Sequence, residues 1–187
     1  MTARTPSPDP DWPDPDWPGA IHAALSHAEV RLVSYVPDAG LKRLIELCQA
    51  DEAMRTIPLT TEEEGVGLSM GAWLGGEKSV LLLQSSGAGN LVNVLGAVRE
   101  CRFPLLLLVT MRGEGGESNP WQIPMGEAAP TVLKEMGVLV ERVTDPAQVG
   151  TATAAALEST FQSERAVALL ISQSLIGIKG FQEQVDR

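Results

Sequence analysis

Apolar residues follow two alternating patterns along the chain from residue 20 onward. Compact runs rich in Leu, Val and Ile predict strands at residues 30–36, 55–59, 79–83, 105–110, 139–143 and 166–171. Around them, apolar residues recur at helical spacing over residues 20–28, 40–50, 62–74, 90–99, 126–136 and 146–162. The run at 105–109 is apolar at every position, which indicates a strand covered by helices on both faces of a sheet. The pattern therefore predicts an α/β fold with three layers around a doubly wound, mostly parallel sheet.

The chain has the length of a single domain with a short tail. A total of 187 residues is enough to bury one sizeable core. Residues 1–19 are rich in proline and aspartate and repeat Asp-Trp-Pro, a composition that sustains neither helical nor ladder hydrogen bonds. We therefore expect a flexible tail over residues 1–19 and one folded domain over residues 20–187.

Charge and cysteine usage exclude several classes of protein. With 24 acidic and 14 basic residues the formal net charge is −10, and no Lys/Arg cluster is present, so we expect no nucleic-acid partner. Cys48 and Cys101 lie in apolar helical patterns without metal-binding or disulfide spacing, which suits a reducing compartment. The sequence has neither a signal-peptide pattern nor an apolar run long enough to span a membrane, so we expect a cytoplasmic location and no membrane contact.

Clusters of polar residues lie where the predicted buried strands and helices begin or end. The strand at 79–83 breaks into a polar, glycine-rich turn at residues 84–90, and the acidic triplet 62–64 opens a helix. Ligands of open α/β sheets bind at the carboxyl ends of the strands. The glycines of the turn could bring backbone amides close to an anion, or could serve only a tight strand-to-helix connection, because the turn has no P-loop lysine.

The acidic triplet has a structural interpretation and a functional one. Thr61 with Glu64, or Thr60 with Glu63, would form the capping box that starts many helices, and acids suit the helix dipole. A single box uses one glutamate only. If Glu64 caps the helix, Glu63 is free for chemistry.

A long connection follows the strand at 105–110. Residues 111–125 exceed the usual loop length and leave the carboxyl end of a central strand, so they are a candidate lid or a solvated excursion. Arg112 is the obvious local cation for an anionic ligand, but it could instead pair with Glu114 or Glu117 in the same loop.

The order of these motifs resembles the pyrimidine-binding domain of thiamine diphosphate enzymes, and most closely that of sulfopyruvate and phosphonopyruvate decarboxylases. The resemblance runs from about residue 32 to residue 171. It is carried by Val36-Pro37-Asp38, by Glu63 ten residues before Trp73, by the turn from Gln84 to Asn90, by Phe103-Pro104, and by Asn119-Pro120-Trp121-Gln122 with Met125-Gly126.

The resemblance implies a set of site residues. Glu63 would be the catalytic residue, hydrogen-bonded to the aminopyrimidine of thiamine diphosphate so that the thiazolium loses its C2 proton and can attack a 2-oxo acid. Glu62 and Glu64 are the alternatives if the register of the helix differs. The other residues that it implies at the cofactor are Pro37, Gln84, Ser86 and Asn90. Those expected at the substrate are Asp38, Gln84, Ser85, Arg112 and Asn119.

Half of such a site is absent from this sequence. The family binds Mg²⁺ and the diphosphate through Gly-Asp-Gly followed by an asparagine some 25 to 30 residues later, and the chain lacks this signature. The resemblance therefore implies no metal ligand here and a beta subunit that supplies them, in an α2β2 or larger assembly.

The expected function is that of the alpha subunit of a two-subunit 2-oxo acid decarboxylase. The substrate would be an anionic 3-substituted pyruvate such as sulfopyruvate or phosphonopyruvate, and the products CO₂ and an aldehyde. A carboligating or acyl-transferring thiamine diphosphate enzyme, or a non-catalytic partner subunit, is the alternative.

Overall fold

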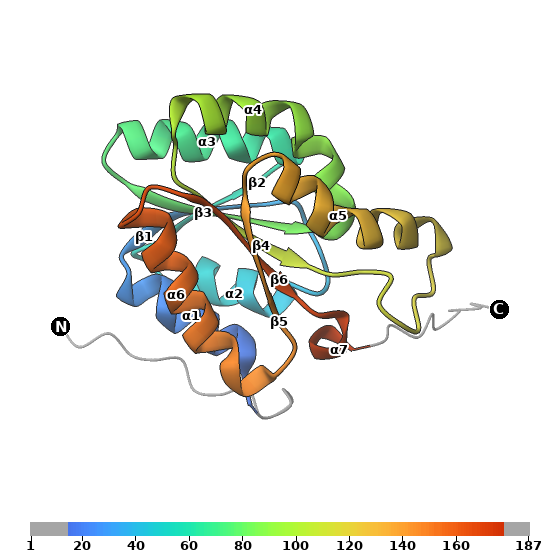
Figure 1. Cartoon of the computed structure of the whole chain (residues 1–187). Coiled ribbons are helices and arrows are strands. Elements are labelled where there is room, and N and C mark those ends of the chain that lie inside the picture. Colours follow the sequence, from blue (N-terminus) through green and yellow to red (C-terminus); the bar gives the residue numbers. More distant parts are fainter. Residues whose placement is uncertain (1–14, 178–187) are drawn as a thin grey trace.

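The computed structural model describes residues 15–177 and contains a single sheet of six parallel strands in the order β2-β1-β3-β4-β6-β5 (Figure 1). The strands are β1 (Val30–Tyr35), β2 (Arg55–Pro58), β3 (Lys78–Gln84), β4 (Leu105–Thr110), β5 (Leu139–Val143) and β6 (Ala166–Ile171). The predicted α/β class, parallel sheet and three layers are confirmed.

Helices cover both faces of the sheet. The α-helices are α1 (Trp17–His27), α2 (Lys42–Ala50), α3 (Glu62–Leu74), α4 (Val92–Cys101), α5 (Ile123–Glu135), α6 (Val149–Phe161) and α7 (Gln173–Ile176). Short 3-10 segments precede three of them: η1 (Ser85–Leu91), η2 (Pro120–Gln122) and η3 (Pro146–Gln148). None of the helices in the described part is long and apolar enough to cross a bilayer.

Alternate residues of the central strands build two separate cores. On β3, Val80 and Leu82 pack with α1, α2 and α6, whereas Leu81 and Leu83 pack with α3, α4 and α5. This follows from the period of two along a strand, which sends successive side chains to opposite faces. A strand covered on both faces is therefore expected to be apolar along most of its length, as residues 105–109 of β4 are.

Helix α1 begins three residues earlier than predicted. The sequence interpretation ended the tail at residue 19, but the helix starts at Trp17, after Asp16 accepts a hydrogen bond from the Gly19 amide at 3.1 Å. Trp17 is 2% exposed and its indole Nε1 donates to the Leu175 carbonyl at 3.1 Å. Proline is acceptable in the first turn of a helix, so Pro18 does not prevent this start. The rest of the predicted tail, residues 1–14, lies outside the described residues.

The strand order defines where a ligand crevice forms. From β1 the chain moves to β2 on one side, and from β3 it moves to β4 on the other side. The connections therefore diverge above the carboxyl ends of β1 and β3, which lie next to each other in the sheet. This switch point is the expected ligand position in an open α/β sheet.

Candidate functional site

Polar side chains from three adjacent strand ends meet at the switch point. Asp38, just beyond β1, accepts a hydrogen bond from Gln84 Nε2 at 3.0 Å and another from Thr110 Oγ1 at 2.8 Å. Ser86 Oγ in turn donates to Gln84 Oε1 at 2.7 Å. The structure therefore brings together Asp38, Gln84 and Ser86, which the sequence interpretation assigned to one site. Thr110, the last residue of β4, was missed there because it appeared only as the end of an apolar strand.

A buried carboxyl group lies beside this network, and it belongs to Glu62. Glu62 is 7% exposed, and Asn90 Nδ2 donates to its Oε2 at 2.7 Å. Gly87 makes room for it: a Cβ at Gly87 would lie only 2.0 Å from Glu62 Oε1. Glycine is therefore required at this turn by close approach of a side chain. The first turn of α3 and the segment η1 thus hold one carboxylate at the sheet edge.

Glu63, the residue to which the resemblance assigns catalysis, has a different environment from Glu62, and its catalytic role stays a prediction. Glu63 is exposed and accepts a hydrogen bond from its neighbour Thr61 at 2.7 Å, while Glu64 accepts from the Thr60 amide and hydroxyl at 3.0 and 2.7 Å. These bonds to Thr60 lower the pKa of the Glu64 carboxyl. Glu64 therefore pairs with Thr60, a pairing that neither predicted capping box contains, and the N-cap residue Thr61 makes no side-chain cap bond.

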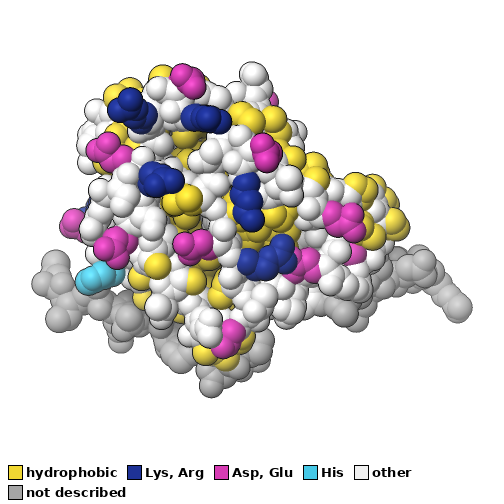
Figure 2. All heavy atoms as spheres, viewed as in Figure 1, with side chains coloured by type: hydrophobic (Ala, Val, Ile, Leu, Met, Phe, Trp, Pro, Cys, Tyr) yellow, Lys and Arg dark blue, Asp and Glu magenta, His cyan; other side chains and the backbone are white. Residues whose placement is uncertain are grey.

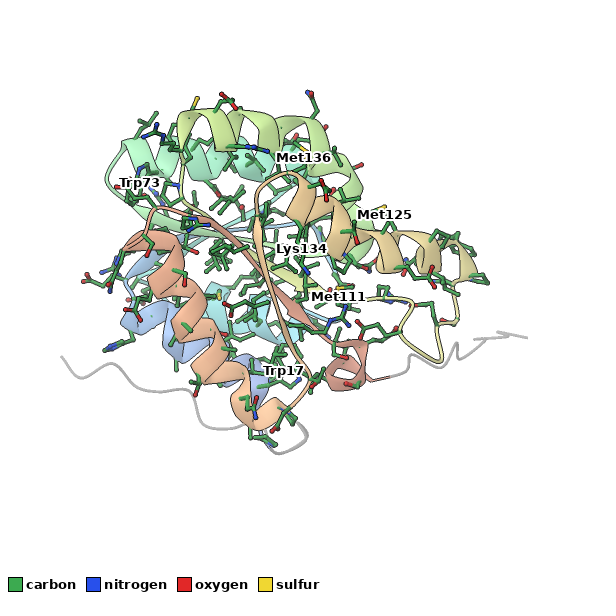
Figure 3. The ribbon with its side chains drawn as sticks, in the orientation of Figure 1. Trp17, Trp73, Met111, Met125, Lys134 and Met136 are labelled. Atoms are coloured by element: carbon green, nitrogen blue, oxygen red, sulfur yellow. The ribbon has the colours of Figure 1, made fainter. Side chains whose placement is uncertain are left out.

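The aromatic residue used to mark this helix lies far from the carboxyl group. Trp73 stacks on Phe161 of α6, with ring centroids 6.2 Å apart. Figure 3 shows Trp73 at the opposite side of the molecule from Met125, which neighbours the turn at Gly89. Helix α3 therefore spans from the site to the far edge of the sheet, and Trp73 has a packing role.

Ser85 and Pro37 occupy different environments at this edge. Ser85 is 0% exposed and its hydroxyl accepts a hydrogen bond from the Arg112 amide at 3.1 Å. It fastens the following loop to the turn, and its predicted contact with substrate stays a prediction. Pro37 is exposed beside Asp38.

Arg112 is engaged by a carboxylate of its own loop. Its Nε and Nη2 both donate to Glu117 at 2.7 Å, and the Glu117 side chain is 2% exposed. The Asn119 amide and Gln173 Nε2 also donate to Glu117, at 3.0 and 3.1 Å. The bidentate bond from Arg112 lowers the pKa of Glu117 to about 2. Of the two pairings that the sequence left open, Glu117 is the partner, and Glu114 instead pairs with Arg142.

The donor set at the edge suits a neutral heteroaromatic group and not a diphosphate. It offers one buried carboxyl group, a second carboxyl in a hydrogen-bond network, amides and hydroxyls, while the local arginine is already neutralised. Among residues 15–177, no cluster of three or more His, Cys, Asp or Glu side chains could hold a metal ion. These residues therefore fit the ring of an aminopyrimidine cofactor, but not its charged end.

Comparisons with known proteins place the chain in a family. No family model matches the sequence. The chain is 31% identical over 156 residues to the sulfopyruvate decarboxylase subunit alpha of Methanothermobacter thermautotrophicus, covering 83% of this chain and 94% of that one. It is also 31% identical over 170 residues to the phosphonopyruvate decarboxylase of Streptomyces viridochromogenes, covering 88% of this chain but 42% of that one.

A solved structure supports the fold independently of the sequence. The 2-oxoglutarate:ferredoxin oxidoreductase from Magnetococcus marinus superposes with a TM-score of 0.67 at 14% identity, over 86% of this chain and 29% of that one. At this identity the likeness concerns the arrangement of strands and helices alone. The methanogen relative, by contrast, matches almost from end to end. The chain therefore belongs to the family of sulfopyruvate decarboxylase alpha subunits.

Proposed function

We propose that this chain is the alpha subunit of a two-subunit decarboxylase that uses thiamine diphosphate to cleave an anionic 3-substituted pyruvate. Sulfopyruvate and phosphonopyruvate are the candidate substrates, since relatives with both names match the chain. The observation that carries the proposal is the buried Glu62 carboxyl group, held by Asn90 in the space left by Gly87 at the switch point.

In this proposal Glu62 takes the role that the sequence interpretation gave to Glu63. The thiamine cofactor, when bound, would supply the electron sink that allows a 2-oxo acid to lose CO₂. Glu62 would hold or share a proton with a ring nitrogen of the aminopyrimidine. Its burial favours this role, because a carboxyl group shielded from water shares a proton with a neighbouring base more readily. Asn90 would fix the orientation of the carboxyl group by its bond to Oε2.

The network around Asp38 would hold the reacting end of the substrate. Gln84 and Thr110 both donate to Asp38, so this carboxyl group is fixed in position at the end of β1. When protonated, this carboxyl group would donate a hydrogen bond or a proton to the ketone oxygen of the 2-oxo acid. Ser86 holds the Gln84 amide and so completes the support of Asp38. Pro37 would line the cofactor from the same loop.

The partner subunit would supply the remaining half of the site. The charged end of the cofactor and its Mg²⁺ require cations and metal ligands that the described residues at this edge of the sheet do not provide, since Arg112 is bound to Glu117. We propose that a beta subunit holds them, in an α2β2 or larger assembly with the site at the interface.

Decarboxylation by the assembled complex tests the proposal. The chain is co-expressed with a protein that carries the Gly-Asp-Gly and asparagine signature, and CO₂ release is measured with sulfopyruvate, phosphonopyruvate and pyruvate in thiamine diphosphate and Mg²⁺. Glu62→Gln should lower kcat by about 10²-fold or more, as for loss of an acid–base group. The matched variants Glu63→Gln and Glu64→Gln should stay within about threefold of wild type, since both side chains are exposed.

Two results would contradict this assignment. Retention of full activity by Glu62→Gln would remove the buried carboxyl group from the chemistry, and loss confined to Glu63→Gln would restore the original interpretation. Product analysis with an added aldehyde separates decarboxylation from carboligation, because only a carboligase would release a longer hydroxyketone.

A further inference from the structure

A second cavity lies at the opposite edge of the sheet from the candidate site. It has a volume of about 370 Å³ and lies between the C-terminal ends of α4 and α5 and the connection from α6 to β6. Figure 2 shows Lys and Arg side chains on this face of the molecule, with Asp and Glu side chains between them. The volume falls in the range of small-molecule pockets.

The cavity is positively charged in a strongly acidic chain. Arg99, Arg102 and Arg165 line it, together with the single acid Glu164, so its formal charge is +2 (three minus one) against −10 for the whole chain. None of the three arginines forms an ion pair with another residue of the described part. The guanidinium groups are therefore available to an external anion. Most of the remaining wall is apolar and includes Leu95, Val98, Phe103, Met136 and Val138.

The backbone at Arg102 indicates that the arginine is kept at a cost in stability. Arg102 ends α4 in the left-handed conformation, with φ 56°, and the amide of Phe103 then bonds the Val98 carbonyl at 3.0 Å. Helix α5 ends with the same bond pattern, but there the left-handed residue is Gly137, with φ 87°. Glycine is the favoured residue at this position because it has no Cβ to clash.

Glu164, on the other side of the cavity, also has a left-handed backbone. Within residues 15–177 the non-glycine residues with positive φ are Glu29, Arg102 and Glu164, so two of the three line this one cavity. Strained residues persist where a side chain is required. The third, Glu29, follows α1 and does not line the cavity.

We propose that this cavity is a second ligand site, separate from the decarboxylase site, that binds an organic phosphate with a planar apolar group, the chemical class that includes nucleotides. Three guanidinium groups match several phosphate oxygens, to which arginine binds in a bidentate manner. The wall of Phe103 and Met136, the latter labelled in Figure 3, would contact the planar group.

Calorimetric titration of the full chain with ADP, pyrophosphate and adenosine tests both parts of the proposal. ADP should bind in a 1:1 ratio at least tenfold more tightly than either fragment, and its affinity should fall as salt increases. Arg102→Gly should weaken ADP binding at least tenfold while the melting temperature stays the same or rises, because glycine relieves the left-handed backbone. Glu29→Gly is the matched control, since it relieves the same strain outside the cavity and should leave ADP binding unchanged.

Several outcomes would overturn the proposal. Absence of ADP binding would do so, as would equal affinity for pyrophosphate and ADP, which would indicate a nonspecific basic patch. Equal affinity for adenosine and ADP would show that the arginines do not take part. Unchanged binding by Arg102→Gly would likewise place the nucleotide elsewhere. Since none of these residues belongs to the decarboxylase site, failure here leaves the proposed function intact.

Discussion

Replacement of Gly87 by alanine would test whether the position of the Glu62 carboxyl group matters. An added Cβ would lie 2.0 Å from Glu62 Oε1, 2.4 Å from Cδ and 2.8 Å from Cγ. Real Cβ contacts are essentially never shorter than 3.0 Å, so the carboxyl group must move by at least about 1 Å. Gly87 does not have a positive φ, so alanine itself fits the backbone. The perturbation therefore acts on Glu62.

The size of the effect on stability follows from the contacts that change. Displacement of Glu62 breaks the hydrogen bond from Asn90. A hydrogen bond to a charged group contributes about 1.5–3 kcal/mol to the free energy of unfolding. Replacement of glycine by alanine returns about 0.4–1 kcal/mol by restricting the unfolded chain. We therefore expect the free energy of unfolding to fall by about 1–2 kcal/mol. A misplacement of 1 Å in a positioned catalytic group costs about 10²-fold in rate.

Urea unfolding and CO₂ release by the assembled complex measure the two effects. Gly89→Ala is the matched control in the same turn, because its Cβ would lie 3.5 Å from Met125 Sδ, an ordinary contact. Gly87→Ala should lose about 10²-fold in kcat and Gly89→Ala less than threefold. If Gly87→Ala keeps wild-type kcat, the exact position of the Glu62 carboxyl group is irrelevant to the reaction and our reasoning fails.

Two further predictions concern stability. The pKa of Glu117 is lowered from 4.5 to about 2 in the folded protein. Its ionised carboxylate therefore stabilises the fold at a pH above 4.5, and this stabilisation is lost as the pH falls from 4.5 through about 2. The urea midpoint should therefore fall more between pH 5 and pH 3 for wild type than for Glu117→Gln. An equal fall in the two proteins would contradict the assignment. Gly67→Ala on the exposed face of α3, where nothing lies within 4 Å, should raise the free energy of unfolding by about 0.5–1 kcal/mol. Gly65→Ala, whose Cβ would lie 2.5 Å from Leu81 Cδ1, should lower it by about 1–3 kcal/mol, and the reverse order would refute this packing.

Most of the fold could be predicted because its signals are local. The fully apolar run of β4 identified a central strand, and alternation with helical segments fixed a parallel sheet. The errors occurred at the ends of helices, where contacts with neighbouring elements determine the residue at which a helix starts. Trp17 joins α1 because its indole finds the Leu175 carbonyl, a contact 158 residues away along the chain. Helix α5 starts at Ile123, three residues before the predicted start at residue 126.

Helical periodicity alone does not separate the glutamates of the triplet. Residues three and four apart share one face of a helix. Glu62 lies four residues before Val66, which is 0% exposed, but Glu63 lies three residues before the same Val66 and four before the open Gly67. The burial of Glu62 depends instead on Gly87 and Asn90 of the turn that follows β3. The hydrogen bond between Glu62 and Asn90 spans 28 residues and had no local signal.

The state of Arg112 bears on how an anionic substrate would be recognised. Both donors of its guanidinium fork are bound to Glu117, and Gln173 and the Asn119 amide complete the coordination of that carboxylate. A sulfonate or phosphonate that made the same bidentate contact with Nε and Nη2 of Arg112 would have to displace a carboxylate with several matched donors, so binding in that manner would be weakened by the cost of the exchange. The predicted contacts of Arg112 and Asn119 with substrate therefore compete with their contacts to Glu117. In the proposed two-subunit enzyme, we therefore expect a cation of the partner subunit to bind the substrate tail and to contribute to the choice between sulfopyruvate and phosphonopyruvate.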